Sequence, residues 1–402
     1  MDARKLSMVL WVINLASIAG CTISYVYLSY FIYNATGNVL LADSVLVAPM
    51  LVPILLYVAI KKVAASGSPR HIFALANAAC LLSALVIFLL LPAFPMIAIA
   101  GALTIGFLDA IQRVTRIVAI KRFFSGEDVK FAVPLTLTAQ FIAGGLAGVM
   151  LAYFKGQTTP MIILSTVAVL FALAGLVSLL LPGSKTIEDK ESPSAPTLLK
   201  STSLANLLKS NPLLKRYLMA SIVFVSVFQG FFNISRVALP AHQLGLNDEY
   251  VGYLQILSSL GALVGAVAFY FYNKTGRTFS ATAVRLVSIA SLAALCAAST
   301  GYSVASSYTA YFAYMFMWEL MFFNYEANVV NACSNADMAH VATYQYAASY
   351  FGIISVTLVG GLLTQYLGLL QTALILSAIY LCYMLSEAFS ANTQRTSTLV
   401  ED

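Results

Sequence analysis

The sequence predicts an all-α membrane protein with about twelve transmembrane helices, arranged as two pseudo-symmetric six-helix bundles. Three observations support this prediction. Apolar runs of roughly 20 residues recur along the chain, and each is long enough to cross the roughly 30 Å of a hydrocarbon core. Lys and Arg gather on alternate connections between the runs. A charged segment with Ser and Pro divides the runs into two sets of six.

The predicted spans are continuous apolar segments, whereas the strands of a membrane barrel are short and alternate in polarity. The chain is 60% hydrophobic and 9% charged, which is typical of a protein whose solvent is mostly lipid. Hydropathy places the spans near residues 8–33, 38–60, 71–92, 95–120, 131–154, 160–182, 214–239, 248–272, 279–299, 303–331, 339–366 and 368–390.

Basic residues fix the orientation of these spans. One side holds most of the 22 Lys and Arg residues, whereas the outer connections hold only Lys155. The basic side carries Arg4, Lys5, Lys61, Lys62, Arg70, Lys121, Arg122, Lys130, Lys185, Lys190, Lys200, Lys209, Lys215, Arg216, Lys274, Arg277, Arg285 and Arg395. Because such residues near span ends stay inside, we expect a multi-pass protein of the bacterial inner membrane with both termini cytoplasmic. The basic residues are scattered, which argues against nucleic acid as a partner.

The clearest internal boundary is a cytoplasmic linker at residues 183–213. It separates an N-terminal bundle, 1–182, from a C-terminal bundle, 214–390, and a cytoplasmic tail follows at 391–402. The distal linker, Leu204 to Arg216, is predicted either as a short amphipathic helix or as a solvated tether with a basic anchor.

The two halves also resemble one another at an offset of 209 residues, which is typical of secondary transporters that rock two bundles about a central site. The matches are Asn38 with Asn247, Gly67 with Gly276, and Asp128 with Asp337.

A short turn follows the eighth span and reads Tyr272-Asn273-Lys274-Thr275-Gly276-Arg277. With six plus six helices, both ends inside and a long charged central loop, the whole chain resembles the major facilitator superfamily and its fold. That family places an Asp-Arg-x-Gly-Arg turn between its second and third helices, and often a weaker copy between the eighth and ninth. Asn273, Lys274, Gly276 and Arg277 occupy the weaker copy, which implies a gating role. The first copy is reduced here to Ala64-Ala65-Ser66-Gly67-Ser68.

The segment from Leu208 to Tyr217 looks like the drug and siderophore exporter branches of the same family. Antiporter branches usually carry a Gly-Pro pair in the fifth helix. This chain has Gly144, Gly145 and Gly148 there without the Pro.

Charged side chains inside the predicted spans are candidates for function. Each costs at least about 2.5–3.5 kcal/mol near the bilayer centre on insertion scales, so those that persist are expected to serve transport. They are Asp109, Arg113 and Arg116 in the fourth span, Arg236 in the seventh, and Glu319 and Glu326 in the tenth.

Asp109 and Arg113 are four residues apart and therefore share one helical face. We expect Arg113 to bind a carboxylate, a catecholate or a similar anion through its planar fork, with Asp109 orienting it. The alternative is an ion pair that only packs the bundle. Arg116 follows on the same face and either contacts the ligand or extends to the cytoplasmic interface.

Glu319 is the predicted proton-coupling residue, followed by Asp109 and Glu326. An apolar, aromatic environment favours the protonated form of a carboxyl, which suits a proton carrier. The alternative is a carboxyl held by Asn or Tyr neighbours for helix packing. Arg236 either attracts an anion near the outer end of its span, bonds carbonyls loosened by Pro240, or extends outward.

Polar and aromatic residues on other spans complete the predicted chamber, which suits an amphipathic organic molecule. The predicted substrate-binding residues, besides Arg113 and Arg236, are Asn14, Tyr25, Gln140, Gln229, Asn233, Tyr346 and Tyr350.

The function predicted first is proton-coupled export of an anionic small molecule, such as a siderophore or a drug-like compound, by alternating access. An uptake symporter for an organic acid or an iron-siderophore is the second reading, and a transporter-like sensor or lipid scramblase is the third. The sequence has no phosphate-binding loop, nucleophile elbow or zinc motif, so we expect no enzyme activity and no cofactor. The expected partners are a small-molecule substrate, protons and the lipid bilayer, and the expected state is a monomer.

Overall fold

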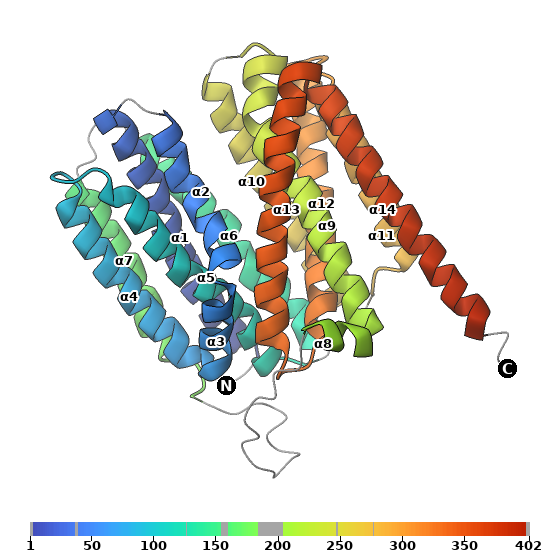
Figure 1. The fold of residues 1–402 in the computed structure, drawn as a ribbon, viewed down its shortest axis with the longest axis horizontal. Coiled ribbons are helices and arrows are strands. Elements are labelled where there is room, and N and C mark those ends of the chain that lie inside the picture. Colours follow the sequence, from blue (N-terminus) through green and yellow to red (C-terminus); the bar gives the residue numbers. More distant parts are fainter. Residues whose placement is uncertain are drawn as a thin grey trace, which may run out of the picture. The chain divides into compact units, whose positions relative to one another are not determined.

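The computed structural model describes residues 3–36, 39–125, 127–153, 160–183, 204–246, 248–275 and 277–398. Every regular element within these ranges is a helix (Figure 1). Before the linker these are α1 (Ala3–Thr36), α2 (Val39–Leu55), α3 (Tyr57–Ser66), α4 (Pro69–Leu90), α5 (Ile97–Phe123), α6 (Glu127–Tyr153) and α7 (Pro160–Ser178). After it come α8 (Leu204–Ser210), α9 (Pro212–Val237), the π-helix η2 (Ala238–Gln243), α10 (Asp248–Lys274), α11 (Ala281–Ala298), α12 (Val304–Ala332), α13 (Met338–Leu367) and α14 (Leu369–Thr398).

Ten of the described helices are long and apolar enough to cross a membrane, and the bent pair of α2 and α3 makes eleven. The remaining predicted span corresponds to α12, which has 29 residues but is not among these apolar helices. Its sequence includes Glu319 and Glu326 together with several Asn and Tyr residues, which lower its hydropathy. The prediction of an all-helical membrane protein is confirmed.

The second predicted span, 38–60, was wrong as one continuous helix. The chain bends by 70° between α2 and α3, and α3 continues to Ser66. Leu56 at the break has φ −107° and ψ 24°, outside the helical region. Pro49 and Pro53 lie within α2, before this break, and each removes one backbone donor from that helix.

Two further boundaries differ from the sequence prediction. The helix expected from Leu204 to Arg216 is divided at Asn211, whose Oδ1 accepts a hydrogen bond from the backbone N–H of Leu214 at 2.9 Å and so caps α9. At the other end, residues 391–398 of the expected tail continue α14, because neither Gly nor Pro interrupts them.

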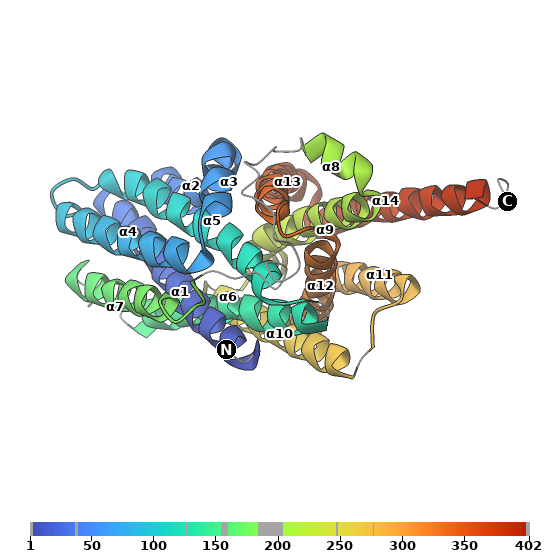
Figure 2. The same ribbon diagram turned by 90° about the horizontal axis from the view of Figure 1, so that it is seen from below.

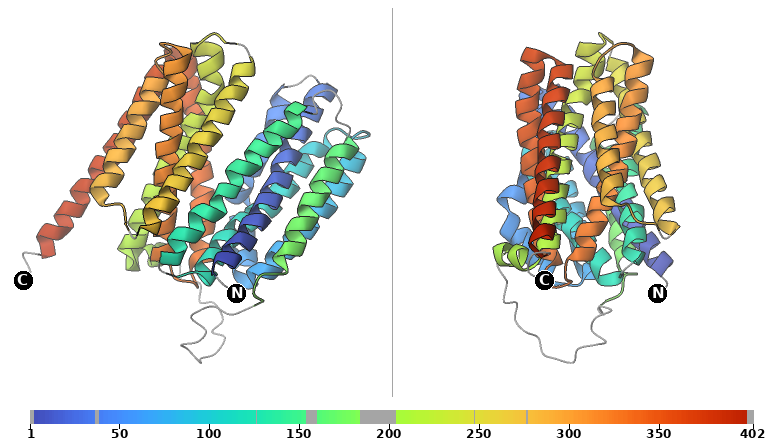
Figure 3. Two further views of the ribbon diagram at one scale, coloured as in Figure 1. Left: turned by 180° about the vertical axis from the view of Figure 1, so that it is seen from behind. Right: turned by 90° about the vertical axis from the view of Figure 1, so that its right-hand side faces the viewer.

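The helices group into two compact units. The first is Met1–Met219 with Tyr325–Tyr350, and the second is Ala220–Asn324 with Phe351–Asp402. The adjoining ends of α12 and α13 therefore belong to the first unit. Within each unit the helices run alongside one another (Figures 2 and 3). The division into bundles at 1–182 and 214–390 stays a prediction.

In the first unit, α1 packs against α2, α5, α6 and α7, and α4 packs against α5 and α7. Close approach of α5 to α2 depends on Gly106, because a Cβ there would lie 2.9 Å from the backbone Cα of Pro49. This contact brings the polar face of α5 against α1 and α2.

In the second unit, buried aromatic rings join α9, α12 and α14. The ring of Phe228 stacks on Tyr314 and meets Tyr380 edge-on, and the Tyr314 hydroxyl donates a hydrogen bond to the Phe228 carbonyl at 2.6 Å. These contacts hold α12 in place and thereby position Glu319.

The close contact between α10 and α12 can be tested at Gly265 of α10. A Cβ at Gly265 would lie 2.5 Å from the Phe316 carbonyl oxygen of α12, whereas a Cβ at Gly252 of the same helix meets nothing within 4 Å. We expect Gly265→Ala to destabilise the protein by about 1–3 kcal/mol through overpacking. Gly252→Ala, the matched control, should leave the thermal unfolding midpoint in detergent unchanged or slightly raised. Equal midpoints for the two variants would contradict the close contact.

Candidate functional site: a cavity at the Asp109–Arg113 pair

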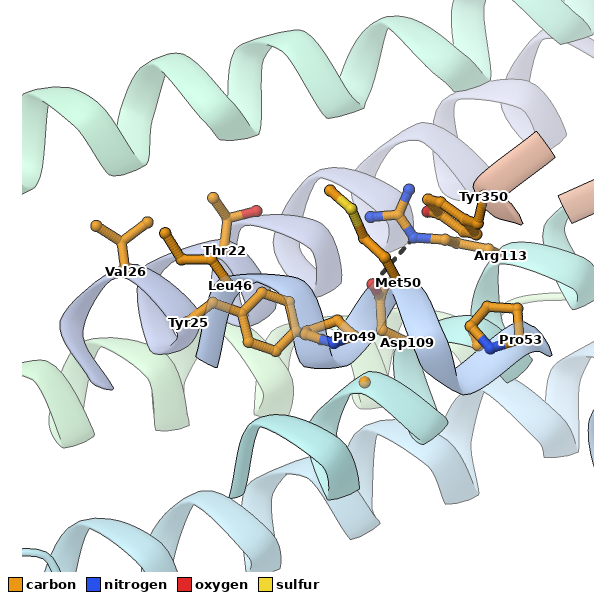
Figure 4. A pocket seen from close by; sticks show the side chains of 12 residues that line it. Thr22, Tyr25, Val26, Leu46, Pro49, Met50, Pro53, Asp109, Arg113 and Tyr350 are labelled. Carbon is orange, nitrogen blue, oxygen red and sulfur yellow. Dashed lines mark hydrogen bonds and ion pairs between the residues drawn. The ribbon is translucent and has the colours of Figure 1, made fainter. Parts of the chain in front are cut away.

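A cavity of about 180 Å³ lies in the first unit between α1, α2 and α5, with Tyr350 of α13 on its edge (Figure 4). Its polar residues are Thr22, Tyr25, Asp109, Arg113 and Tyr350. Its other walls are Val26, Leu46, Pro49, Met50, Pro53, Gly106 and Ala110. A few polar groups in a largely apolar wall are typical of a small-molecule site.

Arg113 and Asp109 form an ion pair at this cavity. The Nε of Arg113 donates to Oδ2 of Asp109 at 2.9 Å, and the two side chains are 22% and 9% exposed, respectively. The terminal nitrogens of Arg113 make no hydrogen bond to another residue in the described ranges. The guanidinium is therefore held in position through one nitrogen and retains two nitrogens for a ligand.

Two tyrosines flank this pair. The ring of Tyr350 lies beside the Arg113 guanidinium, as Figure 4 shows. The Tyr25 hydroxyl is buried and has no hydrogen-bond partner in the described part of the chain. A buried hydroxyl without a partner is costly, so Tyr25 is a second group suited to binding a polar cargo atom.

A second polar cluster lies along the same face of α5. Arg116 is 1% exposed, and its Nη2 donates to the Tyr346 hydroxyl at 3.2 Å. Glu326 of α12 accepts a hydrogen bond from Nε2 of Gln345 at 2.8 Å, and the charge of Arg116 acts on this carboxyl. Arg116 thus lies inside the helix bundle, and the reading in which it extends to the cytoplasmic interface is wrong.

Glu319 lies in the second unit, on the side of α12 that faces Gly265. It is 1% exposed, its Oε2 has no hydrogen-bond partner, and it forms no ion pair with a described residue. An isolated buried carboxylate is too costly to remain ionised. Glu319 does not line the cavity at Arg113.

The structure brings together Asp109, Arg113, Tyr25 and Tyr350 from the predicted site, while Tyr346 stacks on Tyr350 with ring centroids 6.4 Å apart. Asn14 is buried in α1, where its Nδ2 donates to the Leu10 carbonyl at 2.7 Å. Gln140 is half-buried on α6 and does not line the cavity.

Three predicted residues belong to α9 in the second unit. Gln229 is half-buried, and Nδ2 of Asn233 donates to Oγ1 of Thr357 at 3.4 Å. Arg236 is exposed and lies 5.9 Å from the ring centroid of Phe232. None of the three lines the cavity described above, and their roles as binding residues stay predictions.

The predicted gating turn follows α10. Nδ2 of Asn273 donates to the Phe269 carbonyl at 3.1 Å, and Lys274 and Arg277 are exposed. Gly276 lies outside the described residues. In the corresponding turn before α4, Arg122 donates to the Gly67 carbonyl at 2.9 Å. The gating role stays a prediction.

Sequence reasoning missed the α2 wall of the cavity and the buried position of Arg116. Pro49 and Pro53 line the cavity, and nothing in the sequence around them indicates a binding site. For Arg116, its spacing from Arg113 was the available signal, because it places both on one face of α5.

Comparison with solved structures shows the same fold in three transporters. The human organic anion transporter MFSD10 (TETRAN) has a TM-score of 0.74 at 14% identity, over 96% of this chain and 100% of that one. A bacterial homologue of the iron transporter ferroportin, in an outward-facing state, has 0.74 at 12%, over 95% and 99%. The fucose:proton symporter FucP of E. coli has 0.72 at 12%, over 96% and 98%. At these identities the likeness concerns the fold alone.

Comparison of the sequence with family models identifies the family. No curated protein matches the chain. The model of the Major Facilitator Superfamily matches residues 10–364, which is most of the chain. The multi-pass helical structure agrees with that match. The chain therefore belongs to the major facilitator superfamily of membrane transporters.

Proposed function

We propose that this protein is a proton-coupled secondary transporter for an amphipathic organic anion. The observation that supports the proposal is the Arg113–Asp109 ion pair at the edge of a cavity whose other walls are apolar or aromatic. The structurally similar MFSD10 is described as an organic anion transporter and FucP as a proton symporter, which agrees with this class of cargo and coupling.

The cavity suits an anion with an organic body. Arg113 offers two nitrogens in a planar fork, which matches a carboxylate, a catecholate or a sulfonate. The rings of Tyr25 and Tyr350 and the apolar side chains of Leu46 and Met50 supply contacts for the rest of the molecule. An inorganic ion alone would leave this apolar surface without a partner.

Charge balance links the anion to a proton. Arg113 and Asp109 together are neutral, so an anion bound to Arg113 leaves a net negative charge in a cavity of low dielectric. Protonation of Asp109 removes that charge and frees the Nε of Arg113 for the ligand. Anion and proton therefore bind cooperatively, and such cooperativity favours co-transport. With the usual inward proton gradient, the expected direction is uptake.

Export of a siderophore or a drug-like compound, the function predicted first from the sequence, is the second candidate here. Export by exchange requires that cargo and proton compete for one group, as a cationic or neutral cargo would compete for an ionised carboxyl. Glu319 supports this reading, because it is a buried carboxyl without an ion-pair partner among the described residues. Uptake and export can be distinguished by whether protons move in the same direction as the cargo or in the opposite direction.

Benzenesulfonate tests the proposal, because it carries a permanent charge and does not cross lipid as a neutral acid. An inward gradient of this anion across liposomes that contain the protein should acidify the lumen, as reported by an enclosed pH dye. Asp109→Asn should retain binding of the anion but lose at least nine-tenths of the acidification. The control Asp128→Asn changes an exposed carboxyl at the start of α6 and should behave like the unaltered protein.

Two results would count against this coupling. Alkalinisation of the lumen would indicate exchange and favour the exporter. Absence of both anion and proton movement in folded protein would favour the sensor or scramblase reading.

A further inference from the structure

Arg113 is followed on the same face of α5 by a second buried cation. Arg116 is three residues further along, roughly 4.5 Å along the helix axis, and is 1% exposed. Burial to this degree removes the water that would otherwise solvate its charge. The position of Arg116 therefore needs an explanation from its surroundings.

The neighbouring residues satisfy only part of the hydrogen-bonding capacity of the Arg116 guanidinium. Nη2 donates to the Tyr346 hydroxyl, whereas Nε and Nη1 are buried and have no hydrogen-bond partner in the described part of the chain. The charge of Arg116 acts on Glu326, but the two form no ion pair in the described part of the chain, and Oε2 of Glu326 accepts its hydrogen bond from Gln345. Among the described residues, Arg116 therefore has neither an ion-pair partner nor the full set of hydrogen bonds that a buried fork requires.

A pair of tyrosines connects Arg116 to the cavity. Tyr350 lies against Arg113 at the edge of the cavity, as Figure 4 shows. Tyr346, one turn away on α13, stacks on Tyr350 and covers Arg116 through its hydroxyl. A rotation of the Tyr346 side chain would open the path from one guanidinium to the other, and the anion would replace the hydroxyl at Nη2.

We propose that Arg116 is a second anion-binding residue, so that the transporter prefers a cargo with two anionic groups over a matched cargo with one. This inference rests on the proposed function, because it assigns the first anionic group to Arg113. One anionic group pairs with the terminal nitrogens of Arg113, and the other pairs with the fork of Arg116 one helical turn away. The organic part between them contacts Tyr346 and Tyr350.

Isophthalate and benzoate form a matched pair of probes, because they share one aromatic ring and differ in a second carboxylate. Their dissociation constants can be measured by calorimetry on the purified full chain in detergent. We expect the unaltered protein to bind isophthalate at least tenfold more tightly than benzoate. In Arg116→Gln this ratio should fall to about one, while benzoate affinity stays within twofold. Arg116→Lys keeps the charge but not the fork, so it should give an intermediate ratio and also guards against a glutamine variant that does not fold.

The ratio of the two affinities is the decisive quantity, because a general loss of packing would lower both. An unaltered protein without preference for isophthalate, or a ratio that Arg116→Gln and Arg116→Lys both leave unchanged, overturns the role of Arg116. Arg113→Gln separates this failure from that of the proposed function. If benzoate affinity is unaffected by Arg113→Gln, the anion site itself is wrong. If Arg113→Gln abolishes benzoate binding but Arg116 has no effect on the ratio, only the second anionic group is wrong.

Discussion

Replacement of Arg113 by Gln is expected to lower the affinity for benzoate by roughly ten- to a hundredfold, because hydrogen bonds to charged groups contribute about 1.5–3 kcal/mol. Gln has neither the charge nor the fork of the guanidinium. The variant also leaves Asp109, whose side chain is 9% exposed, without its cation. Removal of one partner of a fully buried pair lowers the free energy of unfolding by about 3–5 kcal/mol. The loss should be smaller here, because the side chain of Arg113 is 22% exposed.

A double variant separates binding from folding. Asp109→Asn combined with Arg113→Gln removes both charges, so it should recover most of the unfolding midpoint lost by Arg113→Gln alone. It should not recover benzoate binding. Arg113→Lys retains a point charge and should bind with intermediate affinity. Benzoate binding by folded Arg113→Gln at the level of the unaltered protein would show that the ion pair only packs the bundle.

If cargo and proton exchange at Glu319, as in the export candidate, replacement of Glu319 by Gln is expected to abolish coupled proton movement while the fold is retained. If the coupled proton is on Asp109, as proposed for uptake, coupling persists in this variant. Glu319 is buried with no ion-pair partner among the described residues, and Gln is a close substitute for it in shape. The unfolding midpoint in detergent should therefore stay close to that of the unaltered protein. Gln cannot release a proton, so any step in which Glu319 ionises is lost.

The measurement is the ratio of protons to cargo moved into liposomes, compared between Glu319→Gln and Asp109→Asn. Glu326→Gln serves as a further comparison, because Glu326 is buried and accepts a hydrogen bond from Gln345, so its replacement should reduce stability more than coupling. Unaltered coupled flux in Glu319→Gln would remove this residue from the proton pathway. Loss of coupling in Asp109→Asn alone would place the proton at the Arg113 cavity.

The composition of the chain determined its environment and its class of fold. Apolar runs long enough to cross a bilayer require helices, because backbone groups in lipid must form their hydrogen bonds within one segment. The pairing of Asp109 with Arg113 could also be predicted, since residues four apart on a helix are neighbours whatever the rest of the protein does. Both features, the membrane-spanning helices and the ion pair, follow from the geometry of a single helix.

The tertiary structure alone decided which of the predicted polar residues share a cavity. Arg113 meets Tyr350, more than 200 positions away in the chain, while Asn14 turns to its own helix and Glu319 is enclosed in the second unit. It also decided that Arg116 is buried rather than extended to the interface, and that Leu46, Pro49, Met50 and Pro53 of α2 form a wall of the cavity. These features depend on how helices pack. The rotation of a helix about its axis is set by contacts such as that of Gly106 with Pro49, which hydropathy does not record.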